Sequence, residues 1–330
     1  MTQGPAQCPA CYRFVEPGAF ACPRCGAGVD AARGSQFAAS EPRWSAPLID
    51  EPAPDSADPW AVGAVIHQQY QILGYLGAGG MGTVYKAQDL AESRQVALKV
   101  LDADLVVHRT ASLRMQQEAE ALRRVHHANV VHLYQAFDCC GRLVLALELV
   151  AGGTLTQLIG ERGCSEPHAL YLLQGILAGL QAIHEAGLVH RDIKPDNVLL
   201  TAAGVPKLAD LGVARDLAGV PGRHKTQIGT RIGTPYYMSP EQAQALDVDV
   251  RSDIFSVAVL AYELLSGQKA FEAATELEVL AAIVRQQPPL NRLAGRCRPS
   301  VVDVLAQAMS KDREQRFASA AAMARALALC

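Results

Sequence analysis

The sequence predicts an α+β fold in which a small lobe, built mainly of strands, precedes a larger helical lobe. Between residues 70 and 149, short apolar and β-branched runs alternate with turns, as in an antiparallel sheet. After residue 155, apolar residues recur at helical spacing in long segments. The 330 residues, 50% of them hydrophobic, suffice for a large bilobal domain and exclude collagen-like, acidic disordered and disulfide-scaffold classes.

The predicted elements follow one another in a simple order. Strands are expected at 70–77, 83–89, 95–102, 130–137 and 143–150, with a turn at 138–141 and one helix at about 110–125. A short strand pair is expected at 198–201 and 205–210. Long helices are expected near 166–186, 253–266, 275–286 and 300–309. Sheet first and helices second is the pattern of an α+β architecture.

The chain divides into three stretches of different composition. Residues 1–30 hold four of the nine cysteines, and residues 31–63 form a Pro/Ala-rich acidic linker, in which prolines at positions 42, 47, 52, 54 and 59 favour extended conformations. The globular domain is expected at 64–327, with a small lobe at about 64–150 and a large lobe at about 151–327.

Charge and cysteine usage limit the setting in which the chain acts. The formal net charge of −3 provides no general attraction for nucleic acid or anionic membranes. The most apolar stretches, 143–150 and 254–265, carry Glu148 and Glu263 and are too short to span a bilayer. No signal peptide is apparent, and paired CxxC motifs suit a reducing compartment, so a soluble cytoplasmic protein is expected.

The first 30 residues contain two CxxC turns separated by ten residues. Each turn can point two thiolates at one ion, and two turns complete a closed tetrahedral shell that suits structural Zn²⁺. The expected ligands are Cys8, Cys11, Cys22 and Cys25. The module resembles a short zinc ribbon, and a redox pair or disordered thiols are the alternatives. The remaining cysteines, including Cys139 and Cys140 in the predicted hairpin turn, are interpreted as thiols without a site.

A glycine-rich segment and a single lysine point to phosphate binding. Gly77, Gly79 and Gly82 fit a GxGxxGxV pattern whose backbone amides can close over phosphates. The residues after Gly82 favour a strand, so the loop joins two strands and lacks the helix N-terminus that a dinucleotide-binding loop requires. On the next strand, Lys99 is flanked by apolar residues, and Glu118 of the following helix is a candidate counter-ion.

The chain then reaches motifs that identify a family by resemblance. The string HRDIKPDN at 190–197, the DLG at 210–212, the glycine loop, the VALK at 96–99 and the MSPE at 238–241 resemble the signature set of eukaryotic-type protein kinases. The order and spacing of these motifs match the family over about 64–327, and their residues are most similar to those of bacterial Ser/Thr kinases. The resemblance implies a bilobal protein-kinase-like fold and transfer of the ATP γ-phosphoryl group to Ser or Thr hydroxyls of proteins.

The resemblance also implies roles for individual residues. Asp192 would orient the substrate hydroxyl, Lys194 would lie near the transferred group, and Asn197 and Asp210 would hold Mg²⁺ or Mn²⁺. Lys99, oriented by Glu118, would hold the ATP phosphates, over which the glycine loop closes. The adenine slot would be formed by Leu76, Val84, Ala97, Leu147 and Leu199, with the backbone from Glu148 to Val150 at the adenine edge. Glu241 and Arg316 would form a buried pair, and Asp253 would hold the backbone of the catalytic loop.

Control and partners complete the expectation. Thr226 and Thr230 lie in the loop between Asp210 and Glu241 and are candidate autophosphorylation sites, with Arg191 placed to pair with the phosphate. Thr234 would serve the wall on the substrate side. The expected partners are protein substrates and a second copy that pairs through the sheet lobe during activation. The partner of the ribbon is not identified, and no nucleic acid is expected.

Three other functions are alternatives. The first is a catalytically silent, kinase-like scaffold recruited through the ribbon, which loss of Lys99, Asp192 or Asp210 would indicate; all three are present. A small-molecule or lipid kinase is disfavoured by the SPE segment at 239–241 and the long helical region after it. A zinc-ribbon nucleic-acid binder is disfavoured by the acidic arm. Two departures from the commonest family form, Leu211 for Phe and Ser239 for Ala, alter no proposed phosphate or metal contact.

Overall fold

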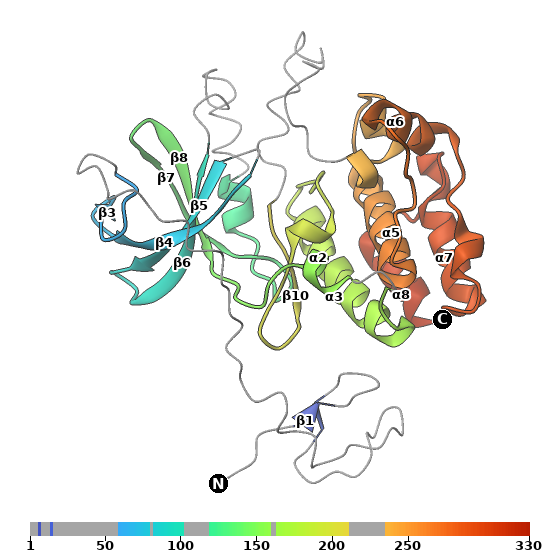
Figure 1. Cartoon of the computed structure of the whole chain (residues 1–330), viewed down its shortest axis with the longest axis horizontal. Helices are drawn as coiled ribbons and strands as arrows, with labels where there is room; N and C mark the ends of the chain where they lie inside the picture. The colour runs from blue at the N-terminus through green and yellow to red at the C-terminus, as the bar shows by residue number, and fades with distance from the viewer. Residues whose placement is uncertain are drawn as a thin grey trace.

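A computed structural model describes residues 59–79, 82–101, 119–159, 163–210 and 235–330, together with two short strands near the N-terminus. Those two strands, β1 (Ala6–Gln7) and β2 (Phe14–Val15), pair with each other in antiparallel fashion. The remaining elements form a sheet lobe and a helical lobe, and the short strand β10 lies between them in Figure 1.

The small lobe is a six-stranded sheet with the order β3-β4-β5-β6-β8-β7, and all of its pairs are antiparallel. Most of its strands follow one another along the chain as hairpins, which is why short loops suffice to connect them. The bounds are β3 Val65–Ile66, β4 Tyr70–Gly79, β5 Gly82–Asp89, β6 Arg94–Leu101, β7 Leu133–Cys139 and β8 Arg142–Glu148. The predicted antiparallel sheet is therefore confirmed, and the two-residue β3 is an addition.

The strand predicted at 130–137 begins three residues later than expected. Val130 forms a parallel bridge with Leu208, and the backbone amide of Val131 donates to the Leu208 carbonyl at 2.8 Å. These residues therefore pair with β10 (Pro206–Leu208) of the large lobe rather than with β8. An apolar run in the sequence does not reveal which strand its backbone will pair with. Either β8 or β10 could satisfy the same backbone amide and carbonyl groups.

A compact apolar cluster stabilises the small lobe. It includes the buried side chains of Tyr70, Leu98 and Phe137, and the Tyr70 and Phe137 rings stack with centroids 5.4 Å apart. Trp60 packs against this cluster, and its ring stacks on that of Tyr85 at 5.7 Å. The ordered contacts of this lobe thus begin before residue 64, where the sequence places the start of the domain.

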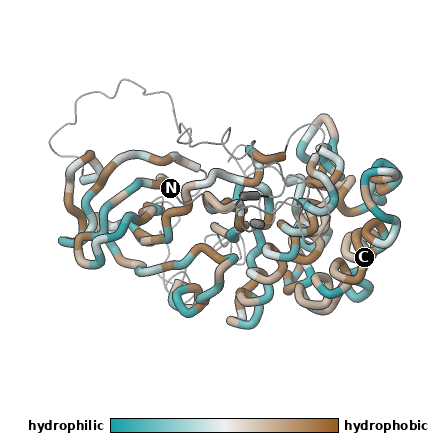
Figure 2. The backbone as a smooth tube through the Cα atoms, turned by 90° about the horizontal axis from the view of Figure 1, so that it is seen from below, coloured by the Kyte–Doolittle hydropathy of each residue, from teal (hydrophilic) through white to brown (hydrophobic). Residues whose placement is uncertain are grey.

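The second lobe is built from helices around α5 (Val250–Ser266), which is buried along nearly its whole length. The Asp249 side chain caps the start of α5, and Gly267, in the left-handed conformation with φ of 72°, ends it. Around it lie α3, α6, α7 and α8, and Figure 2 shows brown hydrophobic residues alternating with teal ones around the turns of this lobe. The other bounds are α2 Leu155–Leu158, α3 Glu166–Glu185, α4 Pro240–Ala243, α6 Glu276–Arg285, α7 Pro299–Ala308 and α8 Ala320–Ala328.

The helices agree closely with the predicted ones. The segments expected near 166–186, 253–266, 275–286 and 300–309 correspond to α3, α5, α6 and α7. Of the helix expected at about 110–125, residues 119–123 are helical and the earlier part lies outside the described residues. Leu122 and Val125 of this segment belong to one apolar cluster with Leu145 of β8 and the interior of the helical lobe. One continuous core therefore connects the two lobes.

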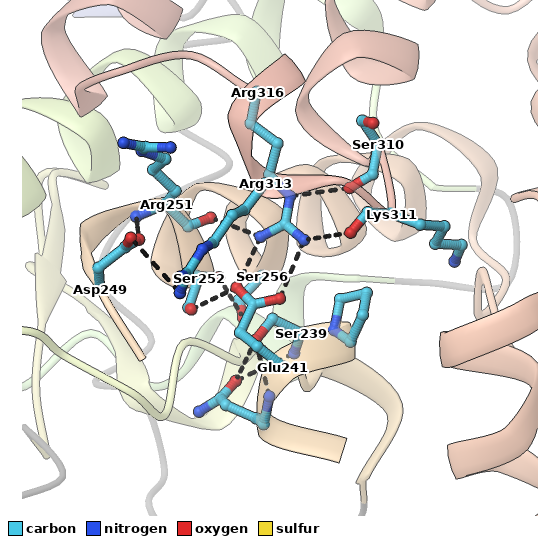
Figure 3. Close-up of polar contacts among 12 residues, drawn as sticks. Ser239, Glu241, Asp249, Arg251, Ser252, Ser256, Ser310, Lys311, Arg313 and Arg316 are labelled. Atoms are coloured by element: carbon cyan, nitrogen blue, oxygen red, sulfur yellow. Dashed lines mark hydrogen bonds and ion pairs between the residues drawn. The ribbon is translucent and has the colours of Figure 1, made fainter. Parts of the chain in front are cut away.

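A buried ion pair anchors the far side of the helical lobe, as the sequence predicts. Arg316 donates to both carboxylate oxygens of Glu241, at 2.7 and 3.0 Å (Figure 3). The same guanidinium donates to the backbone carbonyls of Ser310, Lys311 and Arg251, and the Ser252 hydroxyl donates to Glu241. This full set of partners allows two charges to be buried without an unpaired donor.

Among the described residues, every helix is too short or too polar to cross a bilayer.

Candidate functional site

The glycine loop is a hairpin between β4 and β5, and a side chain at one of its glycines would be strained. Gly82 adopts φ of +139°, and a Cβ built there would lie 2.0 Å from the carbonyl oxygen of Val100. By contrast, a Cβ at Gly77 or Gly79 would meet nothing within 4 Å. The predicted strand-loop-strand arrangement is confirmed at Gly79 and Gly82, while Gly80 and Met81 lie outside the described residues.

Strand register gathers four of the predicted nucleotide-binding side chains on one face of the sheet. Val84 pairs with Lys99, and Ala97, two residues before Lys99, pairs with Leu147. Directly paired residues and residues two apart share a face, so these side chains point to the same side. Val84, Ala97 and Leu147 are half-buried, as are Leu76 in the irregular part of β4 and Leu199 of the other lobe.

The segment after β8 connects the lobes through a side chain as well as through the backbone. The Glu148 carboxylate accepts from the ammonium of Lys207 in β10 at 2.9 Å and from the backbone amide of His132 at 3.2 Å. The Glu148 amide itself donates to the His132 carbonyl at 2.8 Å. The sequence suggested only a backbone role at positions 148–150; it did not reveal this ion pair between the two lobes.

The catalytic-loop carboxylate is held by two nearby side chains. The Asn197 amide nitrogen donates to the Asp192 carboxylate at 2.9 Å and to the Asp192 backbone carbonyl at 2.8 Å. The Lys194 ammonium lies 3.2 Å from the same carboxylate oxygen. Asn197 is buried, whereas the Asp192 side chain keeps 11% of its surface exposed. One partly accessible carboxylate is thus fixed in direction beside a cation.

The backbone of this loop is held by hydrogen bonds to a side chain of α5. The Asp253 carboxylate accepts from the backbone amides of His190 and Arg191, both at 2.8 Å, as predicted. Arg191 has φ of 64°, a conformation that side-chain-bearing residues rarely adopt without such support. Burial lowers the pKa of His190, which favours a neutral ring packed under the loop. We therefore interpret His190 as a residue that packs under the loop and not as an acid or base.

A short hairpin brings Asn197 and Asp210 to the same place. The strands β9 (Val198–Leu200) and β10 pair in antiparallel fashion, so the residues that flank them meet at one end. There the amide of Ala209 donates to the carbonyl of Asn197 at 2.8 Å. Asp210 follows directly, with φ of 54°, and its carboxylate accepts from the Lys99 ammonium at 2.6 Å.

These contacts link Lys99, Asp210, Asn197 and Asp192 across the two lobes. Lys99 is 8% exposed, and its ammonium forms an ion pair with the Asp210 carboxylate. Glu118, the counter-ion suggested from the sequence, lies outside the described residues. So do Leu211, Gly212, the threonines Thr226, Thr230 and Thr234, and the cysteines Cys8, Cys11, Cys22 and Cys25.

Sequence reasoning missed two polar links beside Asp192. The Gln242 side chain donates to the Arg191 carbonyl at 2.8 Å while its oxygen accepts from the Ser239 amide at 3.0 Å. Nearby, the Tyr237 hydroxyl donates to Glu263, and Lys269 donates to the same carboxylate at 2.5 Å. These groups join the segment after residue 234 to the catalytic loop and to α5. The only sequence signal for Gln242 was its capping-box position three residues after Ser239.

Comparisons with known proteins place this geometry in a family. Residues 70–327 match the family model of the protein kinase domain. The serine/threonine-protein kinase PknL of Mycobacterium bovis is 36% identical over 262 residues, which cover 79% of this chain and 65% of PknL. PksC of Streptomyces coelicolor, also named a serine/threonine-protein kinase, is 37% identical over 265 residues, covering 77% of this chain and 48% of PksC.

A solved structure agrees with the fold. The PknI kinase domain of Mycobacterium tuberculosis is similar with a TM-score of 0.65 at 26% identity, covering 82% of this chain and 98% of that chain. The chain spans 65% of the length of PknL and 48% of that of PksC, so the comparisons concern one shared domain.

Proposed function

The chain belongs to the protein kinase domain family, and on this premise we propose that it transfers the γ-phosphoryl group of ATP to Ser or Thr hydroxyls of proteins. The observation that carries the proposal is the linked set of Lys99, Asp210, Asn197 and Asp192 between the lobes. Phosphoryl transfer needs little more than these groups, because catalysis rests on position and charge.

In this proposal each side chain has a separate task. Asp192, fixed by Asn197, accepts a hydrogen bond from the substrate hydroxyl and aligns its oxygen with the phosphoryl group. Lys194 compensates negative charge beside it. Lys99 binds the ATP phosphates, so its present contact with Asp210 is exchanged for phosphate oxygens. The half-buried apolar residues around Ala97 exclude water from the adenine ring.

Asp210 and Asn197 are suited to a divalent cation. A carboxylate and a side-chain amide provide oxygen ligands of the kind that Mg²⁺ and Mn²⁺ prefer, and the β9–β10 hairpin brings the two residues to one point. When bound, the cation neutralises charge on the phosphate oxygens. The Asp210 side chain is 41% exposed, which leaves room for a ligand on the side away from Lys99.

Acceptor type and control extend the proposal. The match of Lys194 to the Ser/Thr-specific pattern and the names of both relatives support Ser and Thr as acceptors. Autophosphorylation at Thr226 or Thr230 would add a negative charge with which the Arg191 guanidinium can pair. The backbone before Arg191 is held in place, because the His190 amide donates to Asp253. Pairing of two sheet lobes during activation belongs to the same proposal.

The N-terminal arm is proposed to be a structural zinc ribbon in a reducing, cytoplasmic setting. The pairing of β1 with β2 supports this, because a hairpin whose connection contains Cys8 and Cys11 is the arrangement of a metal-binding turn. Four thiolates would leave no open coordination position, so this ion would have no part in phosphoryl transfer.

One experiment tests the activity and its control together. The full chain is incubated with Mg²⁺ and ATP labelled at the γ-phosphate, with a basic protein as acceptor. We expect Asp192→Asn to reduce transfer by about 100- to 10,000-fold while ATP binding is retained. Asp303→Asn, an exposed carboxylate on α7, is the matched control and should be unaffected.

Two outcomes would contradict the proposal. Equal transfer by the wild type and Asp192→Asn would remove the catalytic assignment, and absence of transfer by both, with ATP still bound, would favour the silent scaffold. Mass mapping of the chain after incubation locates its own phosphates. An unmodified loop in a fully active enzyme would rule out control through Thr226 or Thr230.

A further inference from the structure

Two adjacent cysteines occupy the tip of the β7–β8 hairpin. Cys139 pairs with Arg142, so Cys140 and Gly141 form a two-residue turn. Both have positive φ, 56° and 71°, which is the conformation of a type I′ turn. At the first of these positions Asn, Asp or Gly is normally favoured, because side-chain-bearing residues seldom adopt positive φ. A cysteine in this position breaks a local rule, and such exceptions often mark functional positions.

The fold places the two sulfur atoms on the same side of the turn. Their Sγ atoms are 3.8 Å apart, and both thiols are free. Two ligands at about 2.3 Å from a tetrahedral ion lie about 3.8 Å from each other, so this separation already equals one edge of a thiolate coordination shell. An ion whose two bonds to sulfur enclose a smaller angle than the tetrahedral one needs the sulfurs slightly closer together. A small rotation of the exposed Cys140 side chain provides this change.

We propose that Cys139 and Cys140 form a two-sulfur binding site for a soft, thiophilic ion, of which a trivalent arsenical is the simplest representative. Soft ions prefer thiolate over oxygen and nitrogen ligands. A direct disulfide is a poorer alternative, because adjacent Cα atoms, 3.8 Å apart, are closer than disulfide geometry normally permits. The site is independent of the proposed phosphoryl transfer, since the hairpin tip is the end of β8 opposite Glu148.

The closeness of the two sulfurs favours a ligand that bonds to both of them over a reagent that bonds to one, because the 3.8 Å separation leaves little rearrangement to make. A ligand that bonds to both sulfurs gains from the second bond because it forms within one molecule.

The binding reaction is balanced without an oxidant. With phenylarsine oxide, two arsenic–sulfur bonds replace the bonds of arsenic to its oxide oxygen, and the two thiol protons leave with that oxygen as one water molecule. Arsenic stays trivalent and no sulfur is oxidised.

The test measures protection of Cys140 in the full chain. The protein is titrated with phenylarsine oxide, labelled briefly with iodoacetamide, and digested with trypsin. Residues 125–142 form one tryptic peptide that contains Cys139 and Cys140 and no other cysteine, so the N-terminal CxxC pairs do not interfere. We expect loss of label at Cys140, with unchanged label at the lone thiol Cys330.

A matched variant distinguishes a two-sulfur site from a single reactive thiol. Cys139→Ser removes one sulfur at nearly constant size and keeps Cys140 as the reporter. It should require at least about 100-fold more phenylarsine oxide for the same protection. Cys139→Ala serves as a second variant if the serine perturbs folding. Unprotected Cys140 in the unaltered chain, or equal protection in both variants, would overturn the proposal.

Discussion

At the scale of single residues, one buried carboxylate can determine the shape of a catalytic segment. Asp253 accepts two successive backbone amides and so supports Arg191 in a left-handed conformation immediately before Asp192. Neither Asp253 nor Arg191 needs to contact a substrate for this effect. The direction in which the Asp192 carboxylate points therefore depends on a residue more than 60 positions away along the chain.

Lys311 is a second residue whose surroundings affect its charge. Its ammonium donates to the Ile283 carbonyl at 2.6 Å and lies 4.2 Å from the centroid of the Phe271 ring. Burial, with Arg316 nearby, lowers its pKa from 10.5 to about 8. Between these values the unfolded chain binds the proton more tightly than the folded chain, so this lysine destabilises the fold below pH 8 and the penalty disappears as pH rises toward 10.5.

We therefore predict a pH-dependent effect of Lys311→Met. The substitution loses one hydrogen bond at every pH, but it also removes the penalty for burying a charge. The free energy of unfolding of the wild type should rise relative to that of the variant between pH 8 and pH 10. Denaturant unfolding at several pH values measures this difference, and parallel curves for the two proteins would contradict the lowered pKa.

At the scale of elements, two hairpins carry most of the site. The β4–β5 hairpin carries Gly79 and Gly82 in paired positions, and the β9–β10 hairpin brings Asn197 and Asp210 together. The sequence predicted both hairpins from short apolar runs and turns. It did not predict that β10 would also bind Val131 and, through Lys207, Glu148, since those contacts arise only when the lobes pack together.

The glycine loop offers a matched pair of substitutions. We predict that Gly82→Ala destabilises the small lobe by about 1–3 kcal/mol and weakens ATP binding, because its φ is positive and its Cβ would overlap the Val100 carbonyl. Gly79→Ala, where a Cβ meets nothing, should have a much smaller effect on stability. Thermal unfolding and nucleotide titration of both variants provide the comparison; equal losses would show that the close approach at Gly82 is unimportant.

At the scale of the whole molecule, the chain combines a kinase domain with an arm of different composition. The core continues from Leu145 of the sheet into the helical lobe, so the two lobes should unfold as a coupled unit. The contacts of Trp60 with Tyr85 suggest that this unit begins before residue 64. The domain boundaries and the zinc ribbon remain predictions.

A shortened chain tests this division. The full chain should bind about one zinc ion, and a chain of residues 59–330 should bind none while it retains phosphoryl transfer. A chain that begins at residue 64 also loses the stacked Trp60, worth about 0.5–1.5 kcal/mol, and should melt a few degrees lower. Metal analysis and thermal unfolding give the result. A full chain without zinc would contradict the ribbon, and loss of transfer in 59–330 would contradict an independent domain.

The sequence by itself determined the order of the main strands and helices and the kinase motifs, and it predicted the residues of the candidate site. Periodicity and turn residues act locally, so Lys99 could be assigned to a strand and Asp192 to a loop without a structure. Only the tertiary structure decided which side chains meet: Lys99 with Asp210, Glu148 with Lys207, and the sulfurs of Cys139 and Cys140 at 3.8 Å. Such contacts depend on strand register, lobe packing and turn conformation. Local sequence patterns do not specify these three features, because each depends on how segments are arranged in three dimensions.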